Sequence, residues 1–453
     1  MNASRREFVK NVSLATAGLS VLSSDNLFAK SNETIVNIGF IGVGLRGQGH
    51  LALSLQRKDV NVVAICDVDS RMLEMSNGII KKSGKAMPKV FTGDNYAYRK
   101  LLELKGLDAI IIATPWEWHA PMVLDSLSAG IKYIGTEVCL GITLQQHWDV
   151  VKAAEYNKAN VMMLENVCYR RDVMAALNMV RQGVFGELIH LQGGYQHDLR
   201  GVKLNDGKTA FNSGVEFGEK AFSEARWRTN HSVHRNGDLY PTHGVGPVAM
   251  MIDINRGNRF LTLCSFSSKS RGLHSYIVKK AGENHPNAKV TFKLGDVVTT
   301  NIKCENGETI LLEHDTSLPR PYSLGFRVQG TKGLWMDVNK SIYVEHDGAK
   351  NDQWEDAQPW FDRYDHPLWK RWSKETEGAG HGGMDFFVLH GFIEAVKRKI
   401  PTPMDVYDAA TWSSITPLSE ASIELGNQTI EFPDFTGGQW MLRKNNFSTT
   451  DEY

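Results

Sequence analysis

The spacing of hydrophobic residues changes once along the chain, near residue 185. Before that point, short apolar runs alternate with segments whose apolar residues recur at helical spacing, which is typical of parallel strands joined by helices. Strands are expected at "TIVNIGFI" (34–41), "VNVVAICD" (60–67), "LDAIIIA" (107–113), "IKYIGTEV" (131–138) and "NVMMLEN" (160–166). The pattern predicts a doubly wound, Rossmann-type α/β domain over residues 34–165.

Longer strands with hairpin turns are expected after that point. They lie in "GELIHLQGGYQHD" (186–198), "RFLTLCSFSS" (259–268), "VVTTNIKCENGETILLEHD" (297–315) and "SLGFRVQGTKGLWMDVNKSIYVEHD" (323–347). They predict an open, mainly antiparallel sheet with one face on helices and the other available for ligands or for a second copy of the chain. The helical segments 384–399 and 406–425 are expected to pack back on the first domain. Residues 166–453 would therefore form an α+β domain, with the substrate site between the two domains.

Composition narrows the class of ligand. The chain has 453 residues and balanced charges, with 51 Lys+Arg and 51 Asp+Glu, so a nucleic acid partner is not favoured. A small neutral or weakly charged ligand fits better. The five cysteines contain no CxxC pair and are expected to be small buried hydrophobic residues rather than disulfides or zinc ligands.

Residues 1–30 are expected to be a targeting segment outside the fold. The paired Arg5 and Arg6 precede the apolar run "NVSLATAGLSVL" (11–22), which is too short to span a membrane permanently. The segment resembles a twin-arginine signal and so predicts export of the folded protein to the periplasm. A disordered basic N-terminus is the alternative. No membrane span is expected.

A glycine fingerprint follows the first predicted strand. Gly42, Gly44 and Gly47 are spaced G-x-G-x-x-G around Leu45 and Arg46, which suits a tight turn and a close approach to a pyrophosphate. Asp67 ends the next strand, twenty residues after Gly47. A carboxylate there suits the ribose hydroxyls of NAD and would repel the 2′-phosphate of NADP. The predicted cofactor is NAD.

Ligands of such domains bind beyond the carboxyl ends of the strands. The residues expected along the cofactor on that basis are Thr114, Pro115, Trp116, Glu117, Trp118, His119, Glu137, Val138 and Asn166.

Several longer stretches carry a family resemblance. The chain resembles the glucose–fructose oxidoreductase and inositol dehydrogenase family, for instance at "VQGTKG" (328–333). It is more closely similar to glycoside hydrolase family 109, whose founding activity is an NAD-dependent α-N-acetylgalactosaminidase. The stretches that carry this narrower resemblance are "GYQHDLR" (194–200), "RWRTNH" (226–231), "RNGDLYPTHGVGPVA" (235–249), "GGMDF" (382–386) and "DVYDAATWSSITPLSE" (405–420).

The resemblance implies an unusual glycosidase mechanism. Many sugar dehydrogenases of the broad family carry Glu-Lys-Pro where this chain has Glu137-Val138-Cys139. NAD-dependent glycosidases are exceptions to the rule of two catalytic carboxylates. Oxidation of the sugar at C3 would acidify the C2 proton, the aglycone would leave C1 by elimination, and water addition and reduction would follow. The cofactor would stay bound, and the proton-transfer groups would come from the second domain.

Three residues are the predicted catalytic groups. His243, which can exchange a proton near neutral pH, is assigned the C3 hydroxyl proton, although it could instead be a helix-terminal histidine bonded to the backbone. Tyr195 is the candidate for the C2 proton, although it could merely stack. The resemblance places Tyr240, Pro241, Thr242 and His243 in the substrate site, with Tyr240 also near the nicotinamide. Arg228 and Tyr322 would hold sugar hydroxyls or the N-acetyl group, or serve as interdomain contacts.

Alternatives to this hypothesis remain in the sequence. His231 and His234, with His243, offer three imidazoles, but their spacing matches no familiar zinc site, so no metal is expected. The leading prediction is an exported, retaining glycosidase acting on terminal α-linked N-acetylgalactosamine of glycans. An exported NAD-dependent sugar oxidoreductase and a non-catalytic sugar-binding protein are the two alternatives.

Overall fold

The computed structural model describes residues 34–346 and 352–453, so the predicted signal segment lies outside the described residues. A six-stranded parallel sheet forms the first domain, in the order β3-β2-β1-β4-β5-β6. Its strands are β1 (Val36–Ile41), β2 (Val60–Cys66), β3 (Lys89–Phe91), β4 (Ala109–Ile112), β5 (Tyr133–Thr136) and β6 (Asn160–Met163). Its helices are α2 (Leu45–Gln56), α3 (Ser70–Ser83), α4 (Tyr98–Leu102), α5 (Trp116–Ser128) and α6 (Leu144–Asn157).

Local sequence explains these elements. β4, "AIII", is buried along its whole length, as expected for a central strand covered by helices on both faces. Asp69 caps α3 by accepting a hydrogen bond from the Arg71 backbone N–H, and Gly84 ends the helix in the left-handed region. Thr143 and Gln146 form a capping box at the start of α6. The predicted Rossmann domain is confirmed.

A nine-stranded sheet forms the second domain, in the order β14-β13-β12-β11-β7-β10-β9-β8-β15. Its strands are β7 (Leu188–Gln196), β8 (Phe260–Ser267), β9 (Val297–Cys304), β10 (Thr309–Asp315), β11 (Arg327–Gly330), β12 (Gly333–Met336), β13 (Ser341–Val344), β14 (Glu355–Asp356) and β15 (Ile430–Glu431). Neighbouring strands are antiparallel, apart from the parallel pair β7 and β10. The prediction of a mainly antiparallel sheet is confirmed.

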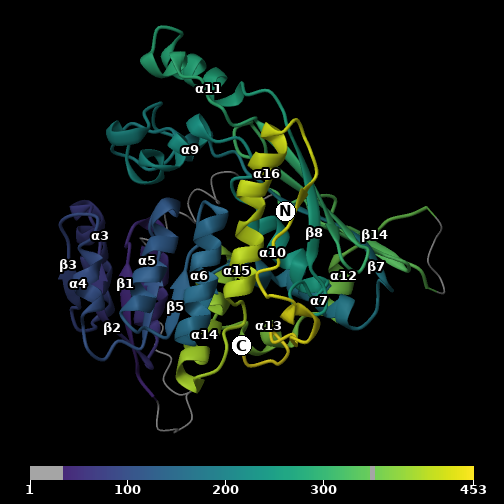
Figure 1. The fold of residues 1–453 in the computed structure, drawn as a ribbon, viewed down its shortest axis with the longest axis horizontal. Coiled ribbons are helices and arrows are strands. Elements are labelled where there is room, and N and C mark those ends of the chain that lie inside the picture. The colour runs from purple at the N-terminus through teal and green to yellow at the C-terminus, as the bar shows by residue number, and fades with distance from the viewer. Residues whose placement is uncertain (1–33, 347–351) are drawn as a thin grey trace.

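Several of the helices that follow β6 contact elements of one or the other domain. The α-helices after β6 are α7 (Arg171–Arg181), α8 (Arg200–Lys203), α9 (Arg228–His234), α10 (Thr242–Met251), α11 (Gly272–Ala281), α12 (Gln358–Arg363), α13 (Pro367–Trp372), α14 (Met384–Arg398), α15 (Val406–Ser413) and α16 (Ile415–Glu424). The short 3-10 helices are η1 (Asn166–Tyr169), η2 (Gly218–Lys220), η3 (Ser223–Arg226), η4 (Pro286–Lys289), η5 (His381–Gly383) and η6 (Gln439–Met441). Helix α10 packs on β7 and α16 packs on β8, whereas α14 contacts α2 and α15 contacts α6 and β6. The C-terminal helices thus join both domains (Figure 1).

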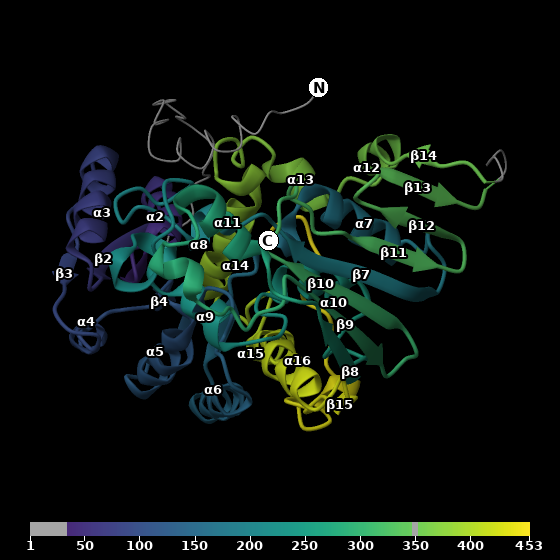
Figure 2. The same cartoon turned by 90° about the horizontal axis from the view of Figure 1, so that it is seen from above.

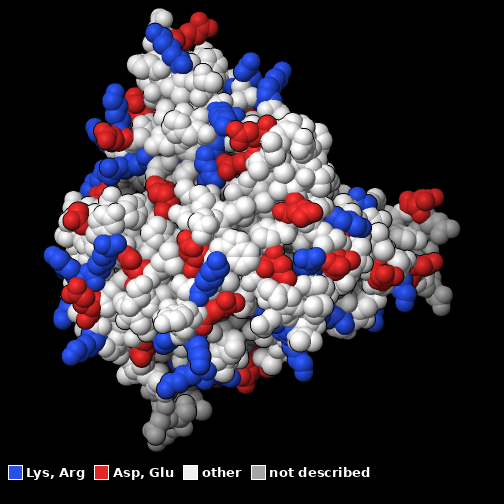
Figure 3. Space-filling view, viewed as in Figure 1, with Lys and Arg blue, Asp and Glu red and all other residues white. Residues whose placement is uncertain are grey.

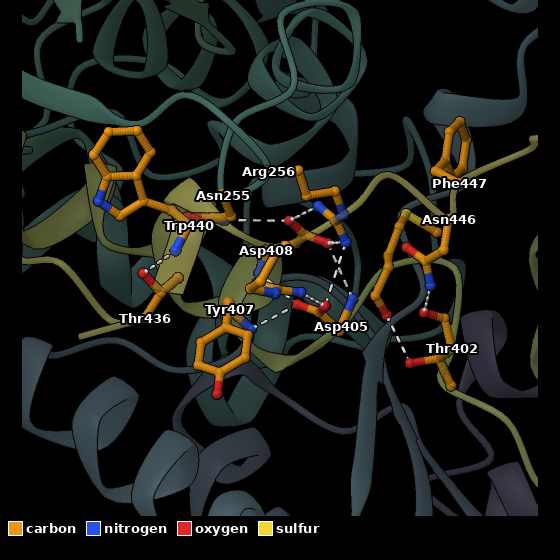
Figure 4. A network of polar contacts seen from close by, with 12 residues as sticks. Asn255, Arg256, Thr402, Asp405, Tyr407, Asp408, Thr436, Trp440, Asn446 and Phe447 are labelled. Carbon is orange, nitrogen blue, oxygen red and sulfur yellow. Dashed lines mark hydrogen bonds and ion pairs between the residues drawn. The ribbon is translucent and has the colours of Figure 1, made fainter. Parts of the chain in front are cut away.

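A buried ion-pair network fixes α15 (Figure 4). The Arg256 guanidinium donates to both carboxylate oxygens of Asp408 at 2.7 Å. Asp405 caps the helix through the backbone N–H groups of Tyr407 and Asp408 and also accepts from Arg443. Burial would raise the pKa of Asp408, but the charge of Arg256 holds it below its ordinary value. Helix α15, which contacts α6 and β6 of the Rossmann domain, is therefore also anchored to the second domain through Arg256.

Part of the second domain lies above the first. Figure 1 shows α9 and α11 above the Rossmann domain, at the end of the molecule away from α14, and the view from above in Figure 2 shows α8 beside them. Charges of both signs are interspersed over the face seen in Figure 3. Within the described ranges, no helix is long and apolar enough to cross a membrane. The five cysteines carry free thiols, and Cys264 is the one that is not fully buried.

Candidate active site

A cavity of about 570 Å³ opens at the carboxyl ends of the Rossmann strands and is closed on its other side by the second domain. The predicted residues that line it are Gly42, Gly44, Leu45, Arg46, Asp67, Thr114, Pro115, Trp116, Glu117, Trp118, His119, Glu137, Val138, Asn166, Tyr195, Arg228, Tyr240 and His243. Four other predicted residues, Gly47, Pro241, Thr242 and Tyr322, are not among its lining residues.

The glycine turn leaves room for a ligand at the start of α2. Gly42 has a φ of +86°, and a Cβ there would lie 2.6 Å from the Ala113 carbonyl oxygen. A Cβ on Gly44 would meet nothing within 4 Å, whereas one on Gly47 would lie 2.2 Å from the Gly42 carbonyl oxygen. Gly47 therefore serves helix packing rather than ligand contact. Helix α2 begins without a side-chain cap or an acidic residue in its first turn, which leaves its N–H groups available to an anion.

Asp67 lies at the far end of the same cleft. Its Oδ2 accepts a hydrogen bond from the Val43 N–H at 2.8 Å, and its Oδ1 accepts from the Asp69 N–H at 2.9 Å. Burial raises the pKa of Asp67, and these backbone hydrogen bonds oppose the shift. The carboxylate is held rigidly where the sequence fingerprint expects a ribose. Together with the open turn at Gly44, this geometry fits a dinucleotide.

A charged network forms the floor of the cleft. Arg46 donates to Glu137 at 2.6 Å and to Asp385 at 2.8 Å. His50 contacts Glu137 at 2.6 Å, and Asn166 donates to Asp385 at 2.7 Å. Burial would raise the pKa of Glu137, but the charge of Arg46 and the contact with His50 lower it to about 2. Sequence reasoning missed Asp385, although it lies in the "GGMDF" stretch.

The first turn of α5 forms one wall. His119 is buried, with Nδ1 2.5 Å from the Cys139 carbonyl oxygen and Nε2 2.7 Å from that of Thr114. Burial lowers the pKa of His119, although both carbonyl contacts oppose this. Because both ring nitrogens face backbone oxygens, His119 positions the loop after β5. Val138 follows there as a buried apolar residue, so no proton-transfer group occupies that position.

Three aromatic rings meet at the substrate end of the cavity. The centroid of the Tyr195 ring lies 4.6 Å from that of Tyr240 and 5.3 Å from that of His243, and the rings of Tyr240 and His243 are 4.8 Å apart. The Nδ1 of His243 lies 2.7 and 2.9 Å from the two carboxylate oxygens of Glu165. Glu165 is fully buried. This pair orients the imidazole and leaves Nε2 as the nitrogen not bonded to Glu165.

Glu165 is the clearest candidate site residue that sequence reasoning did not single out. It follows β6 directly and stands beside the predicted Asn166, so its place at the carboxyl end of a Rossmann strand was the available signal. Its partner His243 lies on α10, and no short motif connects the two.

Glycines set the position of the aromatic cluster. A Cβ on Gly193 would lie 2.3 Å from the Gly244 carbonyl oxygen, and one on Gly244 would lie 2.3 Å from the Gly194 nitrogen. Strand β7 and helix α10 therefore touch backbone to backbone, one residue away from His243 and within two residues of Tyr195. The separation of these two side chains is set by the main chain.

Burial and the positive charge of Arg228 determine the direction of the pKa shifts of Tyr195 and Tyr240. Burial raises the pKa of Tyr195, and the positive charge of Arg228 opposes the shift. Burial also raises the pKa of Tyr240 well above its ordinary value. Arg228 donates to Glu224 at 2.5 Å, and its guanidinium carbon lies 5.1 Å from the Trp116 ring centroid and 4.9 Å from that of Tyr240. Both tyrosines are therefore neutral phenols at neutral pH.

Three predicted substrate residues, Pro241, Thr242 and Tyr322, lie outside the cavity lining. Thr242 is buried at the start of α10. Tyr322 is 42% exposed and reaches the cluster through His197: the Tyr322 and His197 rings are 4.9 Å apart, and the Tyr195 hydroxyl is 3.3 Å from His197 Nδ1. Sequence reasoning did not single out His197. Burial lowers the pKa of His197 to about 4.

The histidines of "HSVH" do not gather around His243. His231 Nε2 faces Glu117 Oε2 at 3.4 Å, and its ring lies 5.0 Å from that of Trp116. In the part of the chain that the structure describes, no three His, Cys, Asp or Glu side chains are grouped as metal ligands.

Known proteins similar to this chain match both domains. Residues 36–165 match the oxidoreductase family with an NAD-binding Rossmann fold, and residues 169–442 match the glycosyl hydrolase 109 C-terminal domain. A glycosyl hydrolase family 109 protein of Stenotrophomonas maltophilia (strain K279a) is 56% identical over 99% of both chains. An alpha-N-acetylgalactosaminidase of Tannerella forsythia is 48% identical over 99% of this chain and 100% of its own.

A solved structure shares the fold. The NAD binding oxidoreductase from Klebsiella pneumoniae superposes with a TM-score of 0.65 at 16% identity, covering 88% of this chain and 99% of the other. The resemblance inferred from the sequence is confirmed, because the two family models match the two domains and a 56% identical relative is a family 109 protein. The chain belongs to glycoside hydrolase family 109, as a glycosidase whose first domain is an NAD-binding Rossmann domain.

Proposed function

We propose that this protein is a retaining glycosidase that removes terminal α-linked N-acetylgalactosamine through NAD-dependent oxidation, elimination, addition and reduction. The observation that carries the proposal is His243, which lines the Rossmann cleft, packs against Tyr195 and Tyr240, and is paired with the buried Glu165. The name of the Tannerella forsythia relative supports the sugar.

The carboxylates near the substrate end favour this mechanism over a two-carboxylate hydrolysis. Glu224 is paired with Arg228 and Glu117 faces His231, so each is engaged by a cationic or imidazole partner. A conventional glycosidase needs one carboxylic acid held protonated opposite a free carboxylate. The groups that converge on the cavity instead are phenols, an imidazole and a guanidinium.

The chain has the residues to hold NAD. Gly42 and Gly44 would admit the pyrophosphate at the start of α2, Asp67 would bind the adenosine ribose, and Trp116 and Glu137 would line the nicotinamide half. When bound, NAD⁺ would accept a hydride from C3 of the sugar and return it at the end of the turnover.

His243 is the proposed acceptor of the C3 hydroxyl proton. Glu165 holds Nδ1, which fixes the ring so that Nε2 is the nitrogen available for proton exchange, as a carboxylate does for a catalytic histidine elsewhere. His243 would thus take over the proton transfer that a lysine performs in related dehydrogenases. In this chain, Val138 stands at the position of that lysine.

Tyr195 is the proposed base for the C2 proton. Its pKa is raised by burial, so the phenol must be helped to ionise, and Arg228 is the positive side chain that opposes the shift. Tyr195 would remove the C2 proton as the aglycone leaves C1. Water would then add to C1 on the face that the aglycone left, and Tyr195 would return a proton to C2, so that the configuration at C1 is retained.

An aryl-glycoside experiment tests this function. Protein purified without added nucleotide is expected to release NAD on denaturation and to hydrolyse aryl α-N-acetylgalactosaminide. Hydrolysis in D₂O is expected to place deuterium at C2 of the released sugar, which NMR detects. A direct displacement at C1 would leave C2 unlabelled, and stoichiometric accumulation of NADH at 340 nm would indicate a net oxidoreductase.

Export is a further part of the proposal. Arg5 and Arg6 before the apolar run 11–22 support a twin-arginine signal, which would deliver the folded, cofactor-loaded protein to the periplasm. Cell fractionation tests this: replacing both arginines by lysine is expected to leave the enzyme in the cytoplasm. Unchanged fractionation would remove the support.

A further inference from the structure

A segment of the second domain lies over the cofactor end of the cleft. Residues 222–231, called here the cover segment, comprise η3 and the first half of α9. They lie above the ends of the Rossmann strands (Figures 1 and 2). Ser223, Arg226 and Trp227 of this segment line the same cavity as Gly44 and Asp67. A dinucleotide in the cleft would therefore have the Rossmann domain on one side and the cover segment on the other.

The cover segment is attached at the adenosine end of the cleft. Arg226 donates to Asp69 Oδ2 at 3.3 Å. The Arg71 guanidinium carbon lies 4.6 Å from the centroid of the Phe222 ring. Asp69 also pairs with Arg71, and it stands two residues after the ribose-binding position Asp67. Both attachments cross from one domain to the other.

The same segment is attached a second time at the nicotinamide end. The Trp227 ring lies 5.1 Å from that of Trp116, with the edge-to-face geometry that stabilises aromatic pairs. His231 faces Glu117 at 3.4 Å. Both partners belong to the first turn of α5. The two attachments bracket the length over which a dinucleotide would lie.

The adenosine-end attachment is the weaker of the two. The Arg226 side chain is 44% exposed, and exposed ion pairs contribute little free energy. At the other end, Trp116 is buried and also contacts Arg228 and Tyr240. The cover segment would therefore open first at the exposed Arg226 contact, with the buried Phe222 behind it.

We propose that the cover segment retains the dinucleotide, and that Arg226 and Phe222 are positioning residues that set how slowly it leaves. The inference rests on the proposed NAD-dependent function. A glycosidase with no net redox change has no need to exchange its cofactor between turnovers. A weak contact at the adenosine end of the cleft would let NAD bind and would still slow its dissociation. Affinity differences of this kind are expressed mainly in the dissociation rate.

The test measures NAD release from the full-length, NAD-loaded protein. Arg226→Asp places a like charge opposite Asp69, and Phe222→Ala removes the ring under Arg71. Each is expected to speed NAD loss by roughly 3- to 10-fold, measured as nucleotide retained after gel filtration at increasing times. The matched control is Arg259→Asp, because Arg259 forms an exposed ion pair with Glu305 in the sheet, outside the cavity lining. It should release NAD within about twofold of the wild-type rate.

Hydrogen exchange separates retention from a merely structural role. Amides of residues 222–231 are expected to exchange more slowly in NAD-loaded than in NAD-free wild type, and Arg226→Asp should reduce that difference. If wild type holds NAD, but both variants release it at the wild-type rate and show the wild-type amide protection, the role of the cover segment is overturned. The proposed function is not affected by that outcome. A wild type that neither contains nor binds NAD would overturn the proposed function as well.

Discussion

His243 and Glu165 show how a single contact defines the chemistry of a residue. The imidazole alone has an unspecified orientation, whereas the buried carboxylate 2.7 Å from Nδ1 fixes the ring and leaves Nε2 as the nitrogen not bonded to Glu165. Sequence reasoning could select His243 from its motif and its place at a helix start. It could not supply Glu165, because the two residues are 78 positions apart and meet only when α10 packs beside the end of β6.

Replacement of His243 tests its role as the C3 proton acceptor. His243→Ala is expected to lower kcat by about 10²–10⁴-fold while the protein still folds and retains NAD. Glu165→Gln should lower kcat as well, by up to about 10⁴-fold, because the ring is kept but its tautomer and orientation are no longer fixed. Deuterium at C3 of the substrate should give a larger isotope effect in His243→Ala than in wild type. Near-normal turnover of His243→Ala would contradict this role and would favour Tyr240 or Tyr195 as the acceptor of the C3 proton.

Asp67 supports a separate prediction about cofactor choice. Asp67→Asn removes the negative charge that would repel a 2′-phosphate, and its amide oxygen can accept from only one of the Val43 and Asp69 N–H groups. We expect weaker NAD retention and a smaller preference of NAD over NADP in competition, with a smaller effect on the thermal midpoint than on NAD retention. Full retention of NAD together with continued rejection of NADP would remove Asp67 from cofactor recognition.

At the scale of elements, periodicity predicted most of the fold. The central Rossmann strands are apolar over their full length, and the strands of the second sheet alternate, so both patterns were readable. The cover segment shows neither helical spacing nor strand alternation of its apolar residues, and it was not predicted as a helix or a strand. Thr242 was assigned to the site by resemblance, and Tyr322 was expected to hold sugar hydroxyls. Tyr322 contacts the Tyr195 cluster through His197, and Thr242 is buried at the start of α10, and such placements depend on tertiary packing.

The attachment of α15 gives a stability prediction at this scale. Arg256→Met leaves Asp408 buried without its cation, which is expected to cost about 3–5 kcal/mol. The exposed pair of Arg259 with Glu305 provides the control, and Arg259→Met should cost no more than about 1 kcal/mol. Urea unfolding followed by tryptophan fluorescence measures both. Equal midpoints in the two variants would show that the network of Figure 4 adds little stability.

For the whole molecule, buried histidines predict a pH dependence of stability. Burial lowers the pKa of each of His147, His197, His366 and His390 to about 4, from an ordinary 6.5. Between those values the unfolded chain binds protons that the folded chain does not, so stability falls as pH drops through that window. The thermal midpoint should be lower at pH 5 than at pH 7. His147→Gln should flatten the dependence, and an identical midpoint at both pH values would contradict it.

The backbone contact between Gly193 and Gly244 has a consequence for how this enzyme tolerates variation. Because no side chain separates β7 from α10, neighbouring core residues can be exchanged without moving Tyr195 relative to His243. The glycines themselves have no such freedom, since a single methyl group would meet main-chain atoms at 2.3 Å. In a randomised library sorted for hydrolysis, both glycine positions should emerge invariant, while the adjacent buried Val245 accepts other apolar residues.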